Sequence, residues 1–237
     1  MFCHDTPYRN LCRRLAAFAT LICLVAVSLA PAQVQAQKPT KKNTKSNAKQ
    51  ETEEAGKNME SIVLGGGCFW CVEAVFLRVQ GVSKVESAYS GGHVPNPTYE
   101  QICTGATGHA EVIRVTFDPE VVSLEQILVI FFKTHDPTTL NRQGNDVGTQ
   151  YRSVVFYADD KQKEATEAVI KKITEENFYD APIVTEVSPL GDVYVAEDYH
   201  QNYFKRNPAN PYCQNVVASK VRKFEKLFKD YSVTGKK

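Results

Sequence analysis

The heptapeptide Gly65-Gly66-Gly67-Cys68-Phe69-Trp70-Cys71 joins two contrasting patterns of apolar residues. It follows the short apolar run Ser61–Leu64, which is typical of a β-strand. After it, apolar residues recur at a helical spacing, namely Val72, Val75, Phe76 and Val79. Because glycine adopts backbone conformations that other residues avoid, three in a row permit a tight turn. The sequence therefore predicts a strand, a tight turn and a helix in immediate succession.

The two thiols of this segment predict reactive cysteine chemistry. We expect Cys68 in the first turn of the helix, where unpaired N–H groups and the helix dipole favour a thiolate. Cys71 follows three residues later, a spacing that places two side chains on one helix face. Phe69 and Trp70 supply an apolar wall between them. This combination is typical of a redox or nucleophilic site.

Two other uses of such a cysteine pair have to be weighed. A zinc site needs about four ligands, and Cys103 and Cys213 do not form a second pair at ligand spacing. Zinc is therefore disfavoured, although Cys103 and His109 are conceivable ligands. A thioredoxin-type loop has the same cysteine spacing but lacks the glycine run and the bulky aromatic pair.

The first part of the chain predicts export rather than folded structure. Residues 1–36 resemble a secretory signal peptide, since arginines precede an apolar run from Leu15 to Ala30 and Val34-Gln35-Ala36 offers a small-x-small cleavage site. The run is short for a membrane span, so an uncleaved anchor is the less favoured alternative. Residues 37–57 are Lys-rich and nearly devoid of apolar side chains, which predicts a disordered linker. We expect a periplasmic or secreted protein without stable membrane insertion after processing.

Residues 58–237 are long enough for one catalytic domain with a full-sized core. This part keeps 19 of the 28 Lys and Arg residues and 23 of the 27 Asp and Glu residues. A slightly acidic balance without a basic face argues against nucleic-acid binding. The domain holds four of the seven cysteines, too few for a disulfide scaffold of this size. We expect a monomer.

Strand and helix patterns alternate along this domain. The predicted strands are 61–64, 82–89, 110–117, 151–157 and 183–188, and the predicted helices are 68–79, 124–133, 159–176, 196–205 and 217–229. Residues 134–150 hold proline and glycine without periodicity and predict a long functional loop. This order predicts an α/β sandwich in which helices pack on a mixed sheet.

Several segments, taken together and in order, resemble the peptide methionine-S-sulfoxide reductases, the MsrA family. The matching segments are Gly67-Cys68-Phe69-Trp70, Pro97-Thr98-Tyr99, Gly105-Ala106-Thr107-Gly108-His109-Ala110-Glu111, His135-Asp136-Pro137, Arg142-Gln143-Gly144-Asn145-Asp146, Gly148-Thr149-Gln150-Tyr151-Arg152-Ser153 and Ala196-Glu197-Asp198-Tyr199-His200-Gln201. The resemblance covers nearly the whole domain. It implies a two-layer sandwich of ferredoxin-like (α-β plait) type, extended by a C-terminal tail.

The resemblance also implies a catalytic set. Cys68 matches the nucleophile that attacks the sulfoxide sulfur. Glu111 matches the acid that protonates the oxygen, which requires a dry pocket that raises its pKa. Tyr99 and Tyr151 match hydrogen-bond donors to the same oxygen. Without the resemblance, Glu111 would be interpreted as a surface acid and the tyrosines as ordinary half-buried residues.

The substrate-binding set follows in the same way. Phe69 and Trp70 match the wall that receives the S-methyl group, and Asp146 matches a position that anchors substrate or an ordered water. On spacing alone the two aromatic residues would be assigned to the core. His109 and His200 lie inside matching motifs, but we interpret both as structural.

Recycling requires a second thiol, because attack leaves Cys68 as a sulfenic acid. The chain departs from the commonest family pattern by having Cys71 where a glycine usually follows the tryptophan. Cys213 matches the resolving position of the family's C-terminal tail, and a flexible tail could carry it to Cys68. We rank Cys213 slightly ahead of Cys71, and a relay through both stays open.

The prediction is thus an exported methionine-S-sulfoxide reductase for free and protein-bound substrate. It would use no metal or organic cofactor, with electrons supplied by a thioredoxin-like dithiol partner. One competing hypothesis is a general thiol–disulfide oxidoreductase that uses Cys68 and Cys71. A second is a non-enzymatic, metal- or thiol-dependent module that recognises oxidised proteins.

Overall fold

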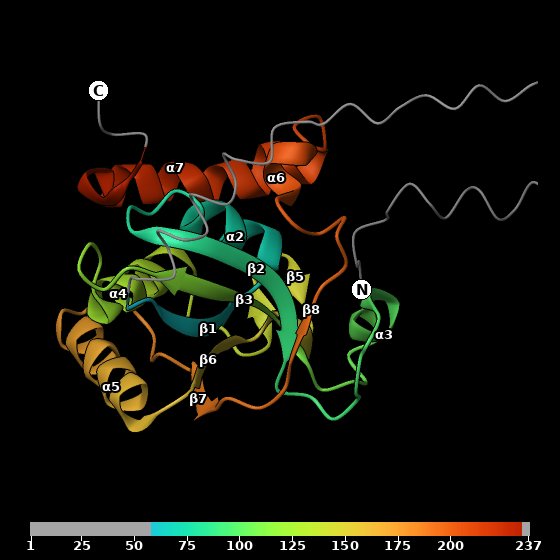
Figure 1. Ribbon diagram of the computed structural model, residues 1–237, viewed down its shortest axis with the longest axis horizontal. Coiled ribbons are helices and arrows are strands. Elements are labelled where there is room, and N and C mark those ends of the chain that lie inside the picture. The colour runs from blue at the N-terminus through green and yellow to red at the C-terminus, as the bar shows by residue number, and fades with distance from the viewer. Residues whose placement is uncertain (1–57, 234–237) are drawn as a thin grey trace, which may run out of the picture. The chain divides into compact units, whose positions relative to one another are not determined.

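The computed structural model describes residues 58–233, and these residues fold around a mixed six-stranded sheet (Figure 1). Its strands are β1 (Glu60–Gly66), β2 (Val82–Ser90), β3 (Ala110–Phe117), β6 (Ser153–Tyr157), β7 (Glu186–Pro189) and β8 (Val193–Val195). They lie in the order β7-β6-β1-β3-β2-β8. Every neighbouring pair is antiparallel except β6 and β7, which run parallel. The prediction of a mixed α/β fold is confirmed.

The helices pack against one face of this sheet. The longer ones are α2 (Phe69–Phe76), α4 (Leu124–Thr134), α5 (Asp160–Glu175) and α7 (Ala218–Leu227). Because side chains alternate along a strand, Ile113 and Val115 of β3 join these helices in the main core, whereas Val112 joins a small separate cluster on the opposite face. Figure 1 shows α7 lying across α2 on the side away from the sheet.

Local sequence signals explain where these helices begin. Ser123 accepts a hydrogen bond from the N–H of Gln126, and the Gln126 side chain accepts one from the N–H of Ser123, which is a capping box before α4. Asp159 caps α5 in a similar way through the N–H of Gln162. In α7, Val221 and Phe224 are buried while Lys226 is exposed, so the helix is amphipathic.

Some predicted elements differ in the structure. Most of the helix predicted over 196–205 is irregular, and α6 (Tyr203–Arg206) alone forms there. A capped helix, α3 (Tyr99–Cys103), lies between the predicted strands 82–89 and 110–117, where no element was predicted. The predicted loop 134–150 contains a small hairpin of β4 (Arg142–Gln143) and β5 (Asp146–Val147). Its positive-φ glycine, Gly144, is the turn signal that predicts such a hairpin.

The C-terminal part corrects a second expectation. Instead of a flexible tail, residues 203–231 form α6, a π-helical turn (Cys213–Val217), α7 and a 3₁₀ turn (Lys229–Tyr231). Phe224 is fully buried in the core. Packing of this apolar stripe fixes the segment against α2.

The predicted signal peptide (1–36) and linker (37–57) lie outside the described residues. Over 58–233, no helix is both long enough and apolar enough to cross a membrane.

Candidate active site

Cys68 lies at the junction of strand β1 and helix α2. Gly67 makes the turn with φ +94°, a conformation that favours glycine. A Cβ at Gly67 would also come within 2.5 Å of the Gln143 side chain. The predicted strand–turn–helix order is confirmed, but Cys68 is the N-cap of α2 rather than a residue of its first turn.

Glu111 lies directly beneath the start of α2. The residue belongs to β3, on the same face as Ile113 and Val115, and only 1% of its surface is exposed. Its Oε2 accepts a hydrogen bond of 3.0 Å from the backbone N–H of Phe69. Burial raises the pKa of Glu111 to about 8, and the charge of Asp146 acts in the same direction. A carboxyl in this environment is a proton donor at neutral pH.

The expectation of a favoured Cys68 thiolate is wrong in this structure. Burial, above all, raises the pKa of Cys68 well above its ordinary value, and the hydrogen bond with Cys71 and the nearby Glu111 charge act in the same direction. The hydrogen bond from Cys68 instead lowers the pKa of Cys71. The helix start cannot offset this burial, because the N–H of Phe69 already donates to Glu111.

Tyr99 and Tyr151 converge on the same place from different elements. Tyr99 opens α3, and Tyr151 ends a 3₁₀ turn (Thr149–Tyr151). Both are buried, and burial followed by the charge of Glu111 raises the pKa of each phenol. Two neutral hydroxyl groups beside a protonated carboxyl can donate hydrogen bonds to a polar oxygen.

Phe69 and Trp70 form a buried aromatic cluster with residues from the C-terminal third of the chain. The Trp70 indole stacks on Tyr203 with ring centroids 3.6 Å apart. Its Nε1 donates to Nδ1 of His200 at 3.0 Å. The His200 ring also lies 4.9 Å from that of Phe69 and 4.4 Å from that of Tyr99. His200 therefore connects the apolar wall with the tyrosine pair.

A pocket of about 220 Å³ opens beside the two thiols. Its lining residues are Cys68, Cys71, Gln143, Gly144, Asn145, Asp146, Tyr212, Asn215, Val216, Ser219 and Lys220. The carboxylate of Asp146 accepts a hydrogen bond of 2.7 Å from the Tyr212 hydroxyl. The sulfur of Cys71 lies 3.7 Å from the same hydroxyl oxygen.

Cys213 lies next to this pocket but does not line it. The thiol is fully buried at the start of the π-helical turn, and burial raises its pKa to about 11. Its backbone N–H bonds to Oδ1 of Asn210. Cys213 is thus held in a packed helix rather than on a flexible tail.

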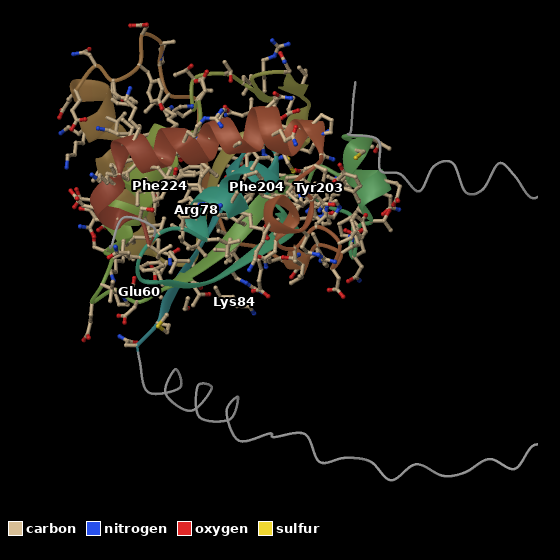
Figure 2. The ribbon with its side chains drawn as sticks, turned by 90° about the horizontal axis from the view of Figure 1, so that it is seen from above. Glu60, Arg78, Lys84, Tyr203, Phe204 and Phe224 are labelled. Carbon is tan, nitrogen blue, oxygen red and sulfur yellow. The ribbon has the colours of Figure 1, made fainter. Side chains whose placement is uncertain are left out.

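A larger groove, of about 760 Å³, lies between α2 and α6 and holds no thiol. The Arg78 guanidinium covers the Phe204 ring there at 5.4 Å (Figure 2). Glu73 is buried in its floor and accepts hydrogen bonds from the N–H groups of Asn202 and Tyr203. Because the smaller pocket contains both thiols, we place the candidate active site there, although its lining does not include Glu111, Tyr99, Tyr151, Phe69 or Trp70.

No cluster of three or more metal-ligating side chains is present in residues 58–233. His109, the conceivable zinc ligand, uses both ring nitrogens within its own loop region. Nδ1 accepts from the N–H of Gly92, and Nε2 lies 2.8 Å from the carbonyl oxygen of Val94. This agrees with the structural role predicted for His109.

Sequence reasoning missed three contributors to the site. His200 was interpreted as structural without a partner, yet it contacts three of the predicted site residues. Tyr212 directly precedes Cys213, a candidate resolving thiol, and this position could have indicated that it lies near the site. Lys220 lies in the middle of an amphipathic helix, and no feature of the sequence distinguishes it from the other lysines of that helix.

Comparison with known proteins agrees with the motifs. The family model described as peptide methionine sulfoxide reductase matches residues 60–232. The peptide methionine sulfoxide reductase MsrA of Trichodesmium erythraeum is 58% identical over 172 residues, which are 73% of this chain and 97% of that protein. The MsrA of Saccharolobus solfataricus is 55% identical over 172 residues, or 73% and 96% of the two chains.

A solved structure supports the same relationship. Methionine sulfoxide reductase A of Corynebacterium diphtheriae aligns with a TM-score of 0.58 and 38% identity, over 65% of this chain and 78% of that chain. The family match spans nearly all of the described residues and includes the strand–turn–helix unit that carries Cys68. This chain therefore belongs to the peptide methionine sulfoxide reductase family, as an oxidoreductase of the MsrA type.

Proposed function

We propose that this enzyme reduces methionine-S-sulfoxide, free or within oxidised proteins, to methionine through Cys68. The observation that carries the proposal is the buried Glu111 carboxyl, linked to the residue after Cys68 by a 3.0 Å hydrogen bond. A raised pKa keeps this acid protonated beside a nucleophile. The preference for the S epimer and for free as well as bound substrate rests on family resemblance.

In the first step, the Cys68 sulfur attacks the sulfoxide sulfur. Glu111 gives a proton to the oxygen, while Tyr99 and Tyr151 donate hydrogen bonds to it. Phe69 and Trp70 enclose the S-methyl group, and Asp146, fixed by Tyr212, helps to hold the substrate. The sulfoxide oxygen ends on Cys68 as a sulfenic acid, so Cys68 is oxidised by two electrons and the substrate leaves as methionine.

In the second step, Cys71 resolves the sulfenic acid. Its thiol attacks the Cys68 sulfur, the two sulfurs join in a disulfide, and the oxygen leaves as water. Cys71 is already hydrogen-bonded to Cys68, whereas Cys213 is fully buried in a packed helical turn. This geometry favours Cys71 over the order that we expected from the sequence. Cys213 then serves at most as a second partner in a relay.

The disulfide returns to two thiols by exchange with a thioredoxin-like dithiol, which is oxidised in turn. This scheme uses no metal and no organic cofactor, since all the electrons pass through sulfur. The N-terminal sequence supports export of the enzyme, with oxidised periplasmic or secreted proteins as substrates. Fractionation of cells that produce the full chain would locate it, and recovery in the cytosol would contradict export.

We propose a ferredoxin-like core for the catalytic domain. The order of β6, β1, β3 and β2, all antiparallel, together with crossovers through α2 and α4, supports this description. This arrangement brings the first strand next to the third, so the end of β1 lies beside Glu111 on β3.

The test is a single turnover of the pre-reduced full-length chain on a methionine-S-sulfoxide peptide without added reductant. Wild type should form about one methionine per chain and a Cys68–Cys71 disulfide, located by mass spectrometry of proteolytic fragments. The Cys71→Ser chain should also form methionine but accumulate a sulfenic acid that dimedone traps. The Cys213→Ser chain should form the same disulfide as wild type.

Other outcomes would decide against parts of this scheme. No methionine from wild type would exclude the reductase. A Cys68–Cys213 disulfide formed at the wild-type rate in Cys71→Ser would restore Cys213 as the first resolving thiol. A disulfide oxidoreductase would instead lose all activity in Cys71→Ser and tolerate Glu111→Gln, and a binding module would show no turnover.

A further inference from the structure

We propose that Lys220 is a positioning residue that stabilises the Cys71 thiolate while Cys71 attacks the Cys68 sulfenic acid. The inference rests on the proposed function, because it deepens the resolving step. It adds a residue from α7 to a site whose other parts were predicted from motifs. It concerns the second step of the cycle rather than methionine formation.

Lys220 places a positive charge in the pocket that the two thiols line. It lines the 220 Å³ pocket together with Cys68 and Cys71, and it is the one cation among the described residues that do so. Its Nζ donates a 2.9 Å hydrogen bond to Oε1 of Gln143. That bond orients the half-buried ammonium group, and within residues 58–233 no carboxylate oxygen lies close enough to form an ion pair with it.

Gln143 is itself held firmly. Its side-chain amide bonds to both the N–H and the carbonyl oxygen of Asp136, at 3.1 and 3.0 Å. Its methylene groups fill the space that a Cβ at Gly67 would occupy. The support for Lys220 therefore adjoins the turn that carries Cys68.

Tyr212 acts on Cys71 from the same pocket but carries no charge. Its hydroxyl donates a 2.7 Å hydrogen bond to Asp146 and lies 3.7 Å from the Cys71 sulfur, and its hydrogen bond with that sulfur lowers the pKa of Cys71. Because Asp146 competes for the single hydroxyl proton, the charge of Lys220 adds a stabilisation of ionised Cys71 that Tyr212 does not supply.

The need for Lys220 grows after methionine has formed. In the reduced enzyme, hydrogen bonds with Cys68 and then Tyr212 lower the pKa of Cys71, and the charge of Lys220 acts in the same direction against burial. Once Cys68 has become a sulfenic acid, that S–H donor no longer exists. Lys220 remains in place, because its own anchor is Gln143 and not Cys68.

The groups that act on Cys71 come from several elements. They are Cys68 before α2, Glu111 on β3, Asp146 on β5, Tyr212 and Cys213 around the π-helical turn, and Lys220 on α7. Burial lowers the pKa of Lys220, but Cys71, Asp136 and Asp146 act against that shift. A cation close to a nucleophilic thiol is the arrangement that activates cysteine in proteins.

The resolving step balances without an outside reagent. The Cys71 thiolate forms a bond to the Cys68 sulfur, and the S–O bond of the sulfenic acid breaks. The departing hydroxide takes up a proton and becomes water. Cys71 is oxidised and the Cys68 sulfur is reduced in the same step.

The test compares Lys220→Met, Lys220→Arg and Lys226→Met in the full-length chain. Lys226 is an exposed lysine on the same helix and is the matched control. After one turnover with peptide sulfoxide, methionine and the Cys68–Cys71 disulfide are followed separately by acid quench and mass spectrometry. In Lys220→Met, disulfide formation should slow about tenfold relative to methionine formation, as for a one-unit rise in a thiol pKa.

A second readout reports the thiolate directly. The rate of Cys71 alkylation by iodoacetamide, located by fragment mass spectrometry, should be lower in Lys220→Met at pH 7 and should rise at higher pH than in wild type. Lys220→Arg should recover both readouts, because it keeps the charge, and Lys226→Met should match wild type.

An unchanged ratio of the two rates in Lys220→Met would overturn the proposal. So would an equal fall of both rates with a lowered melting temperature, since a packing role would produce that result, and so would no recovery by Lys220→Arg. Absence of methionine in wild type would instead remove the proposed function. An unchanged alkylation profile with a slowed disulfide would also contradict stabilisation of the thiolate.

Discussion

The carboxylate of Glu111 accepts a 3.0 Å hydrogen bond from the backbone N–H of Phe69, the residue that follows Cys68. This bond uses one of the free N–H groups at the start of α2 and fixes the acid next to the nucleophile. The N–H group of Phe69 at the start of the helix is therefore bonded to the acid Glu111 and not to the Cys68 thiol. Burial raises the pKa of both groups and so favours the protonated form of each at neutral pH.

Replacing Glu111 with Gln should nearly abolish methionine formation, because an amide accepts the Phe69 hydrogen bond but cannot give a proton to the sulfoxide oxygen. We expect a loss of roughly 10²- to 10⁴-fold in the single-turnover rate. Glu73→Gln is the control, since Glu73 is also a buried carboxylate but faces the backbone of α6. Equal losses in the two variants would contradict an acid role specific to Glu111.

The stability of the protein should fall as the pH rises from about 4.5 to about 8. The folded-state pKa of Glu111 is raised to about 8 and that of Glu73 to about 7, so the folded chain binds more protons than the unfolded chain in this window. The contribution of Glu111 is complete below its ordinary pKa and is lost as the pH passes about 8. Its size is roughly 2–5 kcal/mol.

Urea unfolding at pH 5 and pH 8.5 measures this dependence. Glu111→Gln should reduce the difference between the two pH values, and adding Glu73→Gln should reduce it further. A pH dependence as steep in the double variant as in wild type would show that other groups are responsible.

Trp70→Phe should destabilise the fold as well as weaken substrate binding. The change removes the indole N–H that donates to His200, and it leaves that buried ring nitrogen without its donor. The expected cost is about 1–3 kcal/mol in the free energy of unfolding. Tyr199→Phe is the comparison, because Tyr199 is a half-exposed ring on the same histidine and loses only a hydroxyl group. A similar loss in both variants would contradict the importance of the Trp70 bond.

Gly67→Ala should harm the site more than Gly144→Ala. Both glycines have positive φ, so each substitution costs about 1–2 kcal/mol in backbone strain. Only at Gly67 does the new Cβ collide with a side chain, that of Gln143, whereas nothing lies within 4 Å at Gly144. Unfolding curves and single-turnover rates should both be worse for Gly67→Ala than for Gly144→Ala. Equal losses in the two variants would contradict an effect of the collision with Gln143.

Local patterns predicted much of the scaffold. The glycine run after an apolar strand correctly predicted the turn before α2, and the helix predicted over 124–133 matches α4 closely. Such signals work because turns and caps involve residues that are neighbours in the chain. The failures were the helix over 196–205 and the flexible tail, where contacts with α2 decide the structure.

Glu111 shows a signal that could have been used without any resemblance. It shares strand parity with Ile113, Val115 and Phe117, all of which are buried. An acid on the fully buried face of a strand is exceptional, and it indicates a raised pKa and a function.

Other parts of the site had no local signal. Trp70 and His200 are 130 positions apart, and Lys220 reaches Gln143 across 77 positions. Which helix face meets which loop depends on the packing of α7 over α2, and a single amphipathic pattern does not specify it.

The π-helical turn at Cys213–Val217 has a consequence for how this chain can change length. Such a turn takes up one residue more than an α-helical turn, so everything after it is rotated by about 100° relative to an uninterrupted helix. Tyr212 before the turn and Lys220 after it both face the pocket because of that rotation. Deletion of exposed Gln214 would therefore convert the π-helical turn into an α-helical one and leave Lys220 on the face that it already occupies. The same number of residues wound as a plain α-helix would instead place Lys220 about 80° away from Tyr212 around the helix axis.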